Sequence, residues 1–292
     1  MPRPEYVSEL RFRDTRSTRV HGPTDNPAES PMQERQPPTL LETALLNDRR
    51  VILVVLTAVP IAAWLWIVLM ARDMYGPMNG AAAWMMTTVW HWPHILLLVT
   101  MWVVMMTAMM LPTAAPLILL YATAARRSAE PANPSRRVYA LASGYLMVWG
   151  LFSIVLAATQ RLLASASLLT PMMEPSGPVA GAVLLGVAGV YQLTPLKRAC
   201  LRACRSPLGF MMQRWRSGVA GAFRLGVGHG AYCLGCCWAL MLILFAGGVM
   251  NLTVIVTLTM WVLVEKIAPF AEYTSIASGV GLLGMAVWML VR

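Results

Sequence analysis

Charged side chains are scarce in this sequence. Asp, Glu, Lys and Arg make up only 12% of the residues, whereas 58% are hydrophobic. Soluble domains carry about 25% charged residues, so the composition argues against an ordinary soluble domain. The charges also cluster, which leaves apolar runs of roughly 17–25 residues, the length that crosses the hydrocarbon core of a bilayer. We therefore predict an all-α, polytopic membrane protein whose outer surface faces lipid.

Motifs of common enzyme classes are also missing. We find no phosphate-binding P-loop, no dinucleotide fingerprint and no Ser-centred nucleophile elbow. An ATP-driven pump or a serine hydrolase is therefore not expected. The formal net charge of +10 could suit nucleic acid, but in a membrane protein it more often reflects topology. We expect a binding function rather than an enzymatic one, and no nucleic-acid partner.

The distribution of apolar residues divides the chain into two parts. Residues 1–46 are polar and rich in Pro, Ser, Thr, Arg and Glu, a composition too poor in apolar surface to offset the entropy of folding. We predict a disordered cytoplasmic tail there and a transmembrane helical domain over residues 47–292. About seven spans are expected, at residues 51–70, 92–125, 138–159, 178–192, 229–247, 249–264 and 273–291.

The basic residues predict the orientation, because cytoplasmic loops retain Lys and Arg. With the N-terminus in the cytoplasm, twenty of the 23 basic residues lie inside and only Arg72, Arg161 and Arg292 lie outside. The reverse orientation would invert this ratio. We therefore expect a cytoplasmic N-terminus.

All five cysteines fall into two short segments, as Cys200, Cys204, Cys233, Cys236 and Cys237. Residues four apart share a helix face, so the first two thiols can point the same way. In the second segment His229, Cys233 and Cys237 form one stripe, with Cys236 at its edge. Both segments are expected at the cytoplasmic end, where their donors could converge. Thiolates and an imidazole suit Cu(I) or zinc, and we predict a soft-metal site.

Two other interpretations of the cysteines stay open. A free cysteine can be a small hydrophobic residue in a packed helix, and a close pair can cycle between dithiol and disulfide. A structural disulfide is not expected, because this face should meet the reducing cytosol.

The second predicted span is rich in methionine. Met101, Met105 and Met109 lie on one helix face, and Pro112 and Pro116 follow. Thioethers select Cu(I) among common metals, although methionine is also an adaptable filler of apolar cores. We consider this stripe a candidate path for copper.

Two histidines precede that span. His91 and His94 lie in a Trp-His-Trp-Pro-His run, at the predicted external mouth. Two imidazoles could capture a metal ion there. Imidazoles outside, thioethers in the span and thiolates inside would form a line of donors for copper.

Glu265 is an ionisable residue within or bordering the sixth span, where such a group is expensive and commonly functional. It could pair with Lys266 or with an arginine of the preceding loop, carry a proton, or act as a hard ligand. Tyr191, Gln192 and Thr194 close the fourth span at the same face as supporting hydrogen-bonding groups.

Several of these motifs together resemble one bacterial family. They are Met109-Met110-Leu111-Pro112 with Pro116, Tyr191 to Lys197, Cys200 to Pro207, His229 to Trp238, and Glu265-Lys266 with Pro269. The family is that of predicted metal-binding integral membrane proteins, a domain of unknown function. The resemblance covers roughly residues 50–290 and implies a metal-binding, multi-pass protein of the bacterial inner membrane.

We therefore expect an integral membrane protein that binds copper, in preference to zinc, for transport or delivery. Its expected partners are the lipid bilayer, the metal ion, and a soluble metal carrier or a membrane enzyme. One alternative is a membrane thiol–disulfide oxidoreductase that passes electrons to a quinone. The other is a non-catalytic scaffold of a membrane complex.

Overall fold

The computed structural model describes residues 40–76, 91–128, 133–170, 173–268 and 270–291, with side chains placed from residue 50 onward except at Ala271. Most of the predicted tail, residues 1–46, lies outside these ranges. The elements are α1 (Leu40–Met74), α3 (Trp92–Arg127), α4 (Pro134–Ser165), α5 (Pro178–Gln192), α6 (Pro195–Arg205), α7 (Pro207–Arg214), α8 (Gly218–Cys237), η1 (Trp238–Leu242), α9 (Ile243–Gly247), α10 (Leu252–Ile267) and α11 (Ala271–Val291). The described chain is therefore helical, apart from one isolated β-bridge between Leu169 and Pro175.

Proline and capping residues define where the helices begin. Each of α3, α4, α5, α6 and α7 has a proline in its first turn, where the missing N–H costs nothing and the fixed φ favours the helix. Thr194 accepts a hydrogen bond from Lys197 N at the start of α6, and Asn251 caps α10 in the same way. These caps place the breaks between successive apolar segments.

Within the described ranges, five helical segments are long and apolar enough to cross a membrane, or six if α5 and α6 together count as one bent span. The five are residues 50–74, α3, α4, residues 218–247 and residues 272–291. The bend between α5 and α6 is 66°, and α10 has only 16 residues. The prediction of a helical membrane fold is supported to this extent, whereas the count of about seven is not confirmed.

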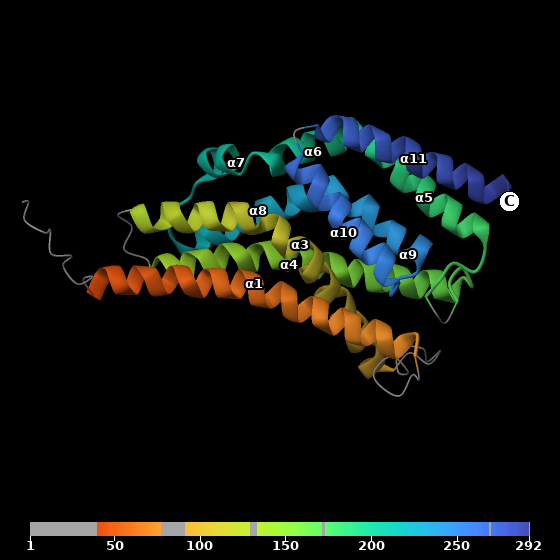
Figure 1. Ribbon diagram of the computed structural model, residues 1–292, viewed down its shortest axis with the longest axis horizontal. Helices are drawn as coiled ribbons and strands as arrows, with labels where there is room; N and C mark the ends of the chain where they lie inside the picture. The colour runs from red at the N-terminus through yellow and green to blue at the C-terminus, as the bar shows by residue number, and fades with distance from the viewer. Residues whose placement is uncertain (1–39, 77–90, 129–132, 171–172, 269, 292) are drawn as a thin grey trace, which may run out of the picture.

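Helices α1 and α4 run roughly along the longest axis of the molecule, and so does the yellow C-terminal half of α3, whereas its gold N-terminal half slants away from that axis (Figure 1). The most extensive contacts join α4 to α8 and α5 to α11. The α4–α8 contact depends on glycine, because a Cβ at Gly226 would lie 2.0 Å from the Leu141 carbonyl oxygen. A Cβ at Gly144 would lie 2.3 Å from Phe223 O. Small residues of this kind let helix backbones approach closely in membranes.

The outer faces of the helices are apolar. Ile61 and Leu65 of α1, Leu151 of α4, Val183 of α5 and Val287 of α11 are each between 57% and 67% exposed. Exposed apolar surface on this scale marks contact with lipid or with partners. The inner face of α3, by contrast, buries its methionines completely.

The close α4–α8 contact generates a stability prediction. Gly144→Ala should lower the free energy of unfolding by about 1–3 kcal/mol, because the added methyl group overlaps backbone atoms. Gly150→Ala on the same helix is the matched control, since a Cβ there meets nothing within 4 Å. Thermal unfolding of both variants in detergent checks this, and equal melting temperatures would contradict the packing described.

Candidate metal centre

Three of the cysteines lie at the C-terminal end of α8, where the helix tightens into η1. Cys233, Cys236 and Cys237 are 1%, 2% and 1% exposed. The thiols of Cys236 and Cys237 each donate to the carbonyl oxygen of Cys233, with an Sγ–O distance of 3.0 Å in both cases. The helix end is thus lined with sulfur on its buried side.

Helix α6 brings the other two cysteines to the same place. The thiol of Cys204 interacts with both Cys233 and Cys236. Cys200 packs against Gly235, where a Cβ would come within 2.8 Å of its Sγ. Both α6 cysteines are partly exposed, and all five are free thiols. The two cysteine segments therefore form one cluster, in which Cys200 and Cys204 are the more accessible members.

Cys233 has two polar neighbours from other helices. Its Sγ lies 2.9 Å from Lys266 Nζ and 3.1 Å from Tyr145 OH. Lys266 also donates to Thr113 Oγ1 at 2.9 Å, and Tyr145 donates to Met110 O at 2.9 Å. An ammonium group at this distance stabilises negative charge on the sulfur. The cluster is thus electrostatically suited to hold a thiolate at Cys233.

His229 lies one turn before Cys233 on α8. Its side chain is 4% exposed and lies between the rings of Tyr145 and Phe210, with centroid distances of 5.8 and 5.4 Å. Its Nδ1 has no hydrogen-bond partner among the described residues. A cavity of about 170 Å³ is lined by His229 together with Cys204 and Lys266. A buried nitrogen without a partner is available as a further donor.

The thiol groups do not point toward one common position for a metal ion. In the described part of the chain, no three His, Cys, Asp or Glu side chains are positioned to hold a metal ion. The reason lies in the hydrogen bonds, because Cys236 and Cys237 both point to the carbonyl oxygen of Cys233. Rotation about χ1, which has only a few staggered minima, would be needed to turn these sulfurs toward a shared ion.

Comparison with known proteins agrees with this donor chemistry. A family model described as PpoB2, copper chaperone, matches residues 99–289. The chain belongs to the PpoB2 family. No curated protein and no solved structure matches the chain. The family supports a copper-related function, and the five thiols and Glu265 all lie within the matched residues.

The predicted outer donors are separate from the cysteine cluster. His91 is exposed at the start of α3, whereas His94 is buried, and both precede the region matched by the PpoB2 family. Met101, Met105 and Met109 are all fully buried along α3. At a rise of about 1.5 Å per residue, the histidines lie several helical turns from the proline break beside the thiols. The structure does not bring the two histidines and the thiols together.

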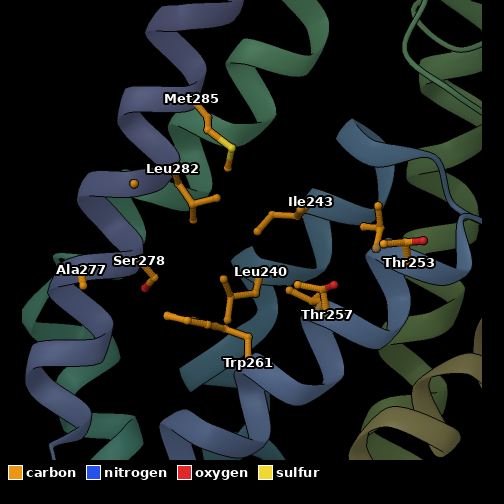
Figure 2. A pocket seen from close by; sticks show the side chains of 12 residues that line it. Leu240, Ile243, Thr253, Thr257, Trp261, Ala277, Ser278, Leu282 and Met285 are labelled. Atoms are coloured by element: carbon orange, nitrogen blue, oxygen red, sulfur yellow. The ribbon is translucent and has the colours of Figure 1, made fainter.

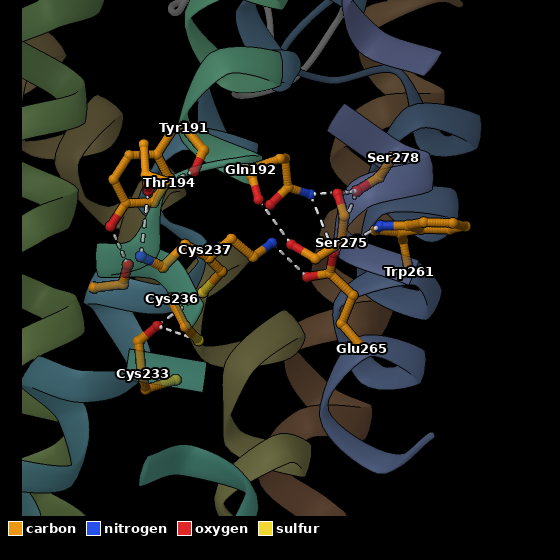
Figure 3. Close-up of polar contacts among 12 residues, drawn as sticks. Tyr191, Gln192, Thr194, Cys233, Cys236, Cys237, Trp261, Glu265, Ser275 and Ser278 are labelled. Carbon is orange, nitrogen blue, oxygen red and sulfur yellow. Dashed lines mark hydrogen bonds and ion pairs between the residues drawn. The ribbon is translucent and has the colours of Figure 1, made fainter. Parts of the chain in front are cut away.

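Glu265 belongs to a second polar network, beside the thiols (Figure 3). Its Oε2 accepts from Lys197 Nζ at 2.7 Å, with side chains 2% and 0% exposed. Its Oε1 accepts from Gln192 Nε2 at 3.1 Å and Trp261 Nε1 at 3.3 Å. Of the possible roles considered for Glu265, the structure shows an ion pair, but with Lys197 rather than with Lys266 or an arginine, because Lys266 points toward Cys233.

The residues at the C-terminal end of α5 connect the cysteine cluster with the Glu265 network. Tyr191 OH donates to the carbonyl oxygen of Gly235, and Thr194 caps α6. Gln192 connects Glu265 to Ser278 of α11, with an Nε2–Oγ distance of 2.7 Å. Ser278 and Trp261 also line an apolar pocket of about 450 Å³ between α10, α11 and the η1–α9 segment (Figure 2). The hydrogen bonds of Tyr191, Gln192 and Thr194 thus position α6 and its cysteines.

Sequence reasoning did not identify Tyr145, Thr113 or Lys266 as neighbours of the thiols. Tyr145 comes from the middle of α4, a span that otherwise carries no donor motif. Lys266 had a detectable signal, since a lysine next to Glu265 in an apolar segment needs a partner of its own.

The Lys197–Glu265 pair generates a prediction about stability. Lys197→Met should destabilise the protein by about 3–5 kcal/mol, because it leaves a buried carboxylate without its cation. The double variant Lys197→Met/Glu265→Met should recover much of this loss, since it removes both buried charges. Thermal unfolding of the two variants beside wild type measures the difference. A double variant less stable than Lys197→Met would contradict an ion pair with a mainly structural role.

Proposed function

We propose that this protein is an integral membrane copper chaperone of the bacterial inner membrane, which binds Cu(I) in the cysteine cluster and delivers it to a partner. The observation that carries the proposal is the convergence of α6 and α8, which packs Cys200 against Gly235 and brings Cys204 to Cys233 and Cys236. Membership of the PpoB2 family supports copper as the cargo. Soft thiolates select Cu(I) over hard divalent ions.

The charge of a copper–thiolate unit explains why Lys266 belongs beside the cluster. Cu(I) carries one positive charge, so two thiolate ligands give the complex a net negative charge. A buried charge without a partner is costly. Lys266 Nζ, 2.9 Å from Cys233 Sγ, supplies the compensating charge. Closed four-thiolate zinc sites would leave a larger negative charge, and we favour copper for this reason.

The unequal exposure of the thiols suits delivery rather than permanent storage. Cys200 and Cys204 are partly exposed, while Cys233, Cys236 and Cys237 are buried. Copper can pass between thiols by stepwise ligand exchange, in which an incoming sulfur replaces an outgoing one. We propose that Cys200 and Cys204 exchange copper with the partner, a soluble carrier or a membrane enzyme, and that the α8 thiols and His229 hold it.

The second part of the proposal concerns the metal-binding side chains outside the cysteine cluster. His91 and His94 would capture copper at the external end of α3, and Met101, Met105 and Met109 would connect that end with the thiols. All three thioethers are fully buried, as a path within the bundle requires. This part is independent of the cysteine cluster and is tested separately.

Membrane insertion with the N-terminus inside is supported by the arrangement of the helices. The start of α1 and the C-terminus lie at opposite ends of the molecule (Figure 1), as an odd number of crossings requires. The start of α1, helix α7 and the ends of α3 and α4 that carry Arg127 and Arg136 share one end. Basic residues gathered at one end follow the positive-inside rule.

Copper binding is tested by Cu(I) titration of the detergent-purified protein without oxygen, using a chromogenic Cu(I) chelator as competitor. Wild type should bind about one Cu(I) per chain in the cysteine cluster and a second at the outer donors, and the Cys204→Ser/Cys233→Ser variant should bind Cu(I) in the cluster at least about 100-fold more weakly. Met260→Leu, an exposed sulfur position on α10, is the matched control. A His91→Ala/His94→Ala variant should keep this site and lose only binding of a second ion.

The same samples separate the copper proposal from thiol redox chemistry. If wild type binds no copper but forms a reversible disulfide between the α6 and α8 segments, the oxidoreductase function replaces the chaperone function. If the protein keeps its function in cells after all five cysteines are replaced by serine, a scaffold function is favoured.

Topology is tested with alkaline phosphatase, which is active only outside the cytoplasm. Fusions after Ser128 and Arg214 should be inactive, and fusions after Ser176 and at the C-terminal end should be active. Activity after Arg214 would mean that α5 does not cross the membrane and would reduce the number of spans.

A further inference from the structure

Three arginines line a second cavity, whose wall also includes Phe210. This cavity has a volume of about 310 Å³ and is bounded by the end of α7 and the first turns of α8. Its charged members are Arg214, Arg216 and Arg224, all exposed. Within the described ranges, no acidic side chain forms a salt bridge with any of the three. Three like charges that share one cavity repel each other, so the site favours an anion.

Arg214 is held in place before any ligand binds. Its guanidinium lies over the rings of Phe210 and Tyr232, at 5.3 and 4.9 Å from their centroids. One of its nitrogens donates to Tyr232 OH at 2.6 Å. Stacking and a hydrogen bond together restrict the long side chain, which reduces the entropy lost on binding.

The turn that carries Arg216 is also restricted. A Cβ at Gly221 would lie 2.5 Å from Arg216 O, so the turn packs directly on α8. Trp215, the preceding residue, stacks on Tyr121 of α3 at a centroid distance of 5.1 Å. Two of the three arginines thus extend from fixed backbone into the cavity.

The chemistry of the cavity selects the ligand class. Guanidinium groups present paired N–H donors that match the oxygens of a phosphate. Helix α7 also exposes Leu208 and Met212, at 53% and 71%, next to this cationic site. Apolar side chains beside a basic cluster at the end of a helical bundle are typical of contact with anionic lipid.

We propose that Arg214, Arg216 and Arg224 form a binding site for a phosphate group, supplied by the headgroup of an anionic phospholipid. The phosphate oxygens would accept hydrogen bonds from the guanidinium groups, while the acyl chains lie along the exposed apolar face of α7. This site is separate from the thiols and does not depend on copper binding.

The test uses the full chain in a non-ionic detergent, with lipid adducts counted by native mass spectrometry. Phosphatidylglycerol should bind in preference to phosphatidylcholine. Replacement of all three arginines by glutamine should weaken phosphatidylglycerol binding roughly tenfold or more, since each removes charge-assisted hydrogen bonds. The matched control is Arg127→Gln/Arg198→Gln/Arg202→Gln, which removes the same charge outside the cavity and should keep the preference.

Further arms make the outcome decisive. Equal loss of phosphatidylglycerol binding in the cavity variant and in the control variant would overturn the site, because such a loss would reflect net charge alone. Inorganic phosphate that binds as well as phosphatidylglycerol, with no preference between the two lipids, would overturn the lipid as the source. If the triple variant does not fold, Arg216→Gln alone replaces it, since the Arg216 guanidinium forms no hydrogen bond, ion pair or ring contact with the described residues. Cu(I) binding by the triple variant should equal that of wild type.

Discussion

The buried ion pair between Lys197 and Glu265 is the interaction on which the candidate site depends. It fixes the start of α6 to α10, and Arg205 fixes the end of α6 by donating to the carbonyl oxygen of Ala268. Held at both ends, α6 places Cys204 against the thiols of α8. A buried ion pair seldom adds much net stability, because desolvation offsets the attraction. Its value here is positional, since the 66° bend after α5 would otherwise leave α6 free to swing away.

Helix α10 supports two networks with adjacent residues. Successive residues on a helix point about 100° apart, so Glu265 faces α6 while Lys266 faces Cys233 and Thr113. Any rotation of α10 would disturb both the anchor of α6 and the charge beside the thiols. The short length of α10 and its caps at Asn251 and Ala268 limit such rotation. The geometry of the cysteine cluster and the packing of the bundle are therefore determined together.

Much of the fold could be predicted from hydropathy, because lipid requires helices whose backbone hydrogen bonds are internal. The first three predicted spans correspond to α1, α3 and α4, and the helix predicted from His229 begins earlier, at Gly218. The cysteine segments could be named because i, i+4 spacing needs only local geometry. Tyr145 and Lys266 could not, since their place beside Cys233 depends on how closely α4 approaches α8 at Gly144 and Gly226, and on which way α10 faces. The pairing of Glu265 with Lys197 could not be predicted for the same reason, since it depends on the bend between α5 and α6.

The contact between α5 and α11 has a consequence for biosynthesis. These helices pack extensively, yet α5 ends at Gln192 and α11 begins at Ala271, so α5 leaves the ribosome well before its partner exists. Until then Gln192 lacks Ser278 and Ser275, and Lys197 lacks Glu265. During synthesis these polar groups must therefore be solvated in another way until α10 and α11 have been made. A nascent chain truncated before α10 would keep them without these partners.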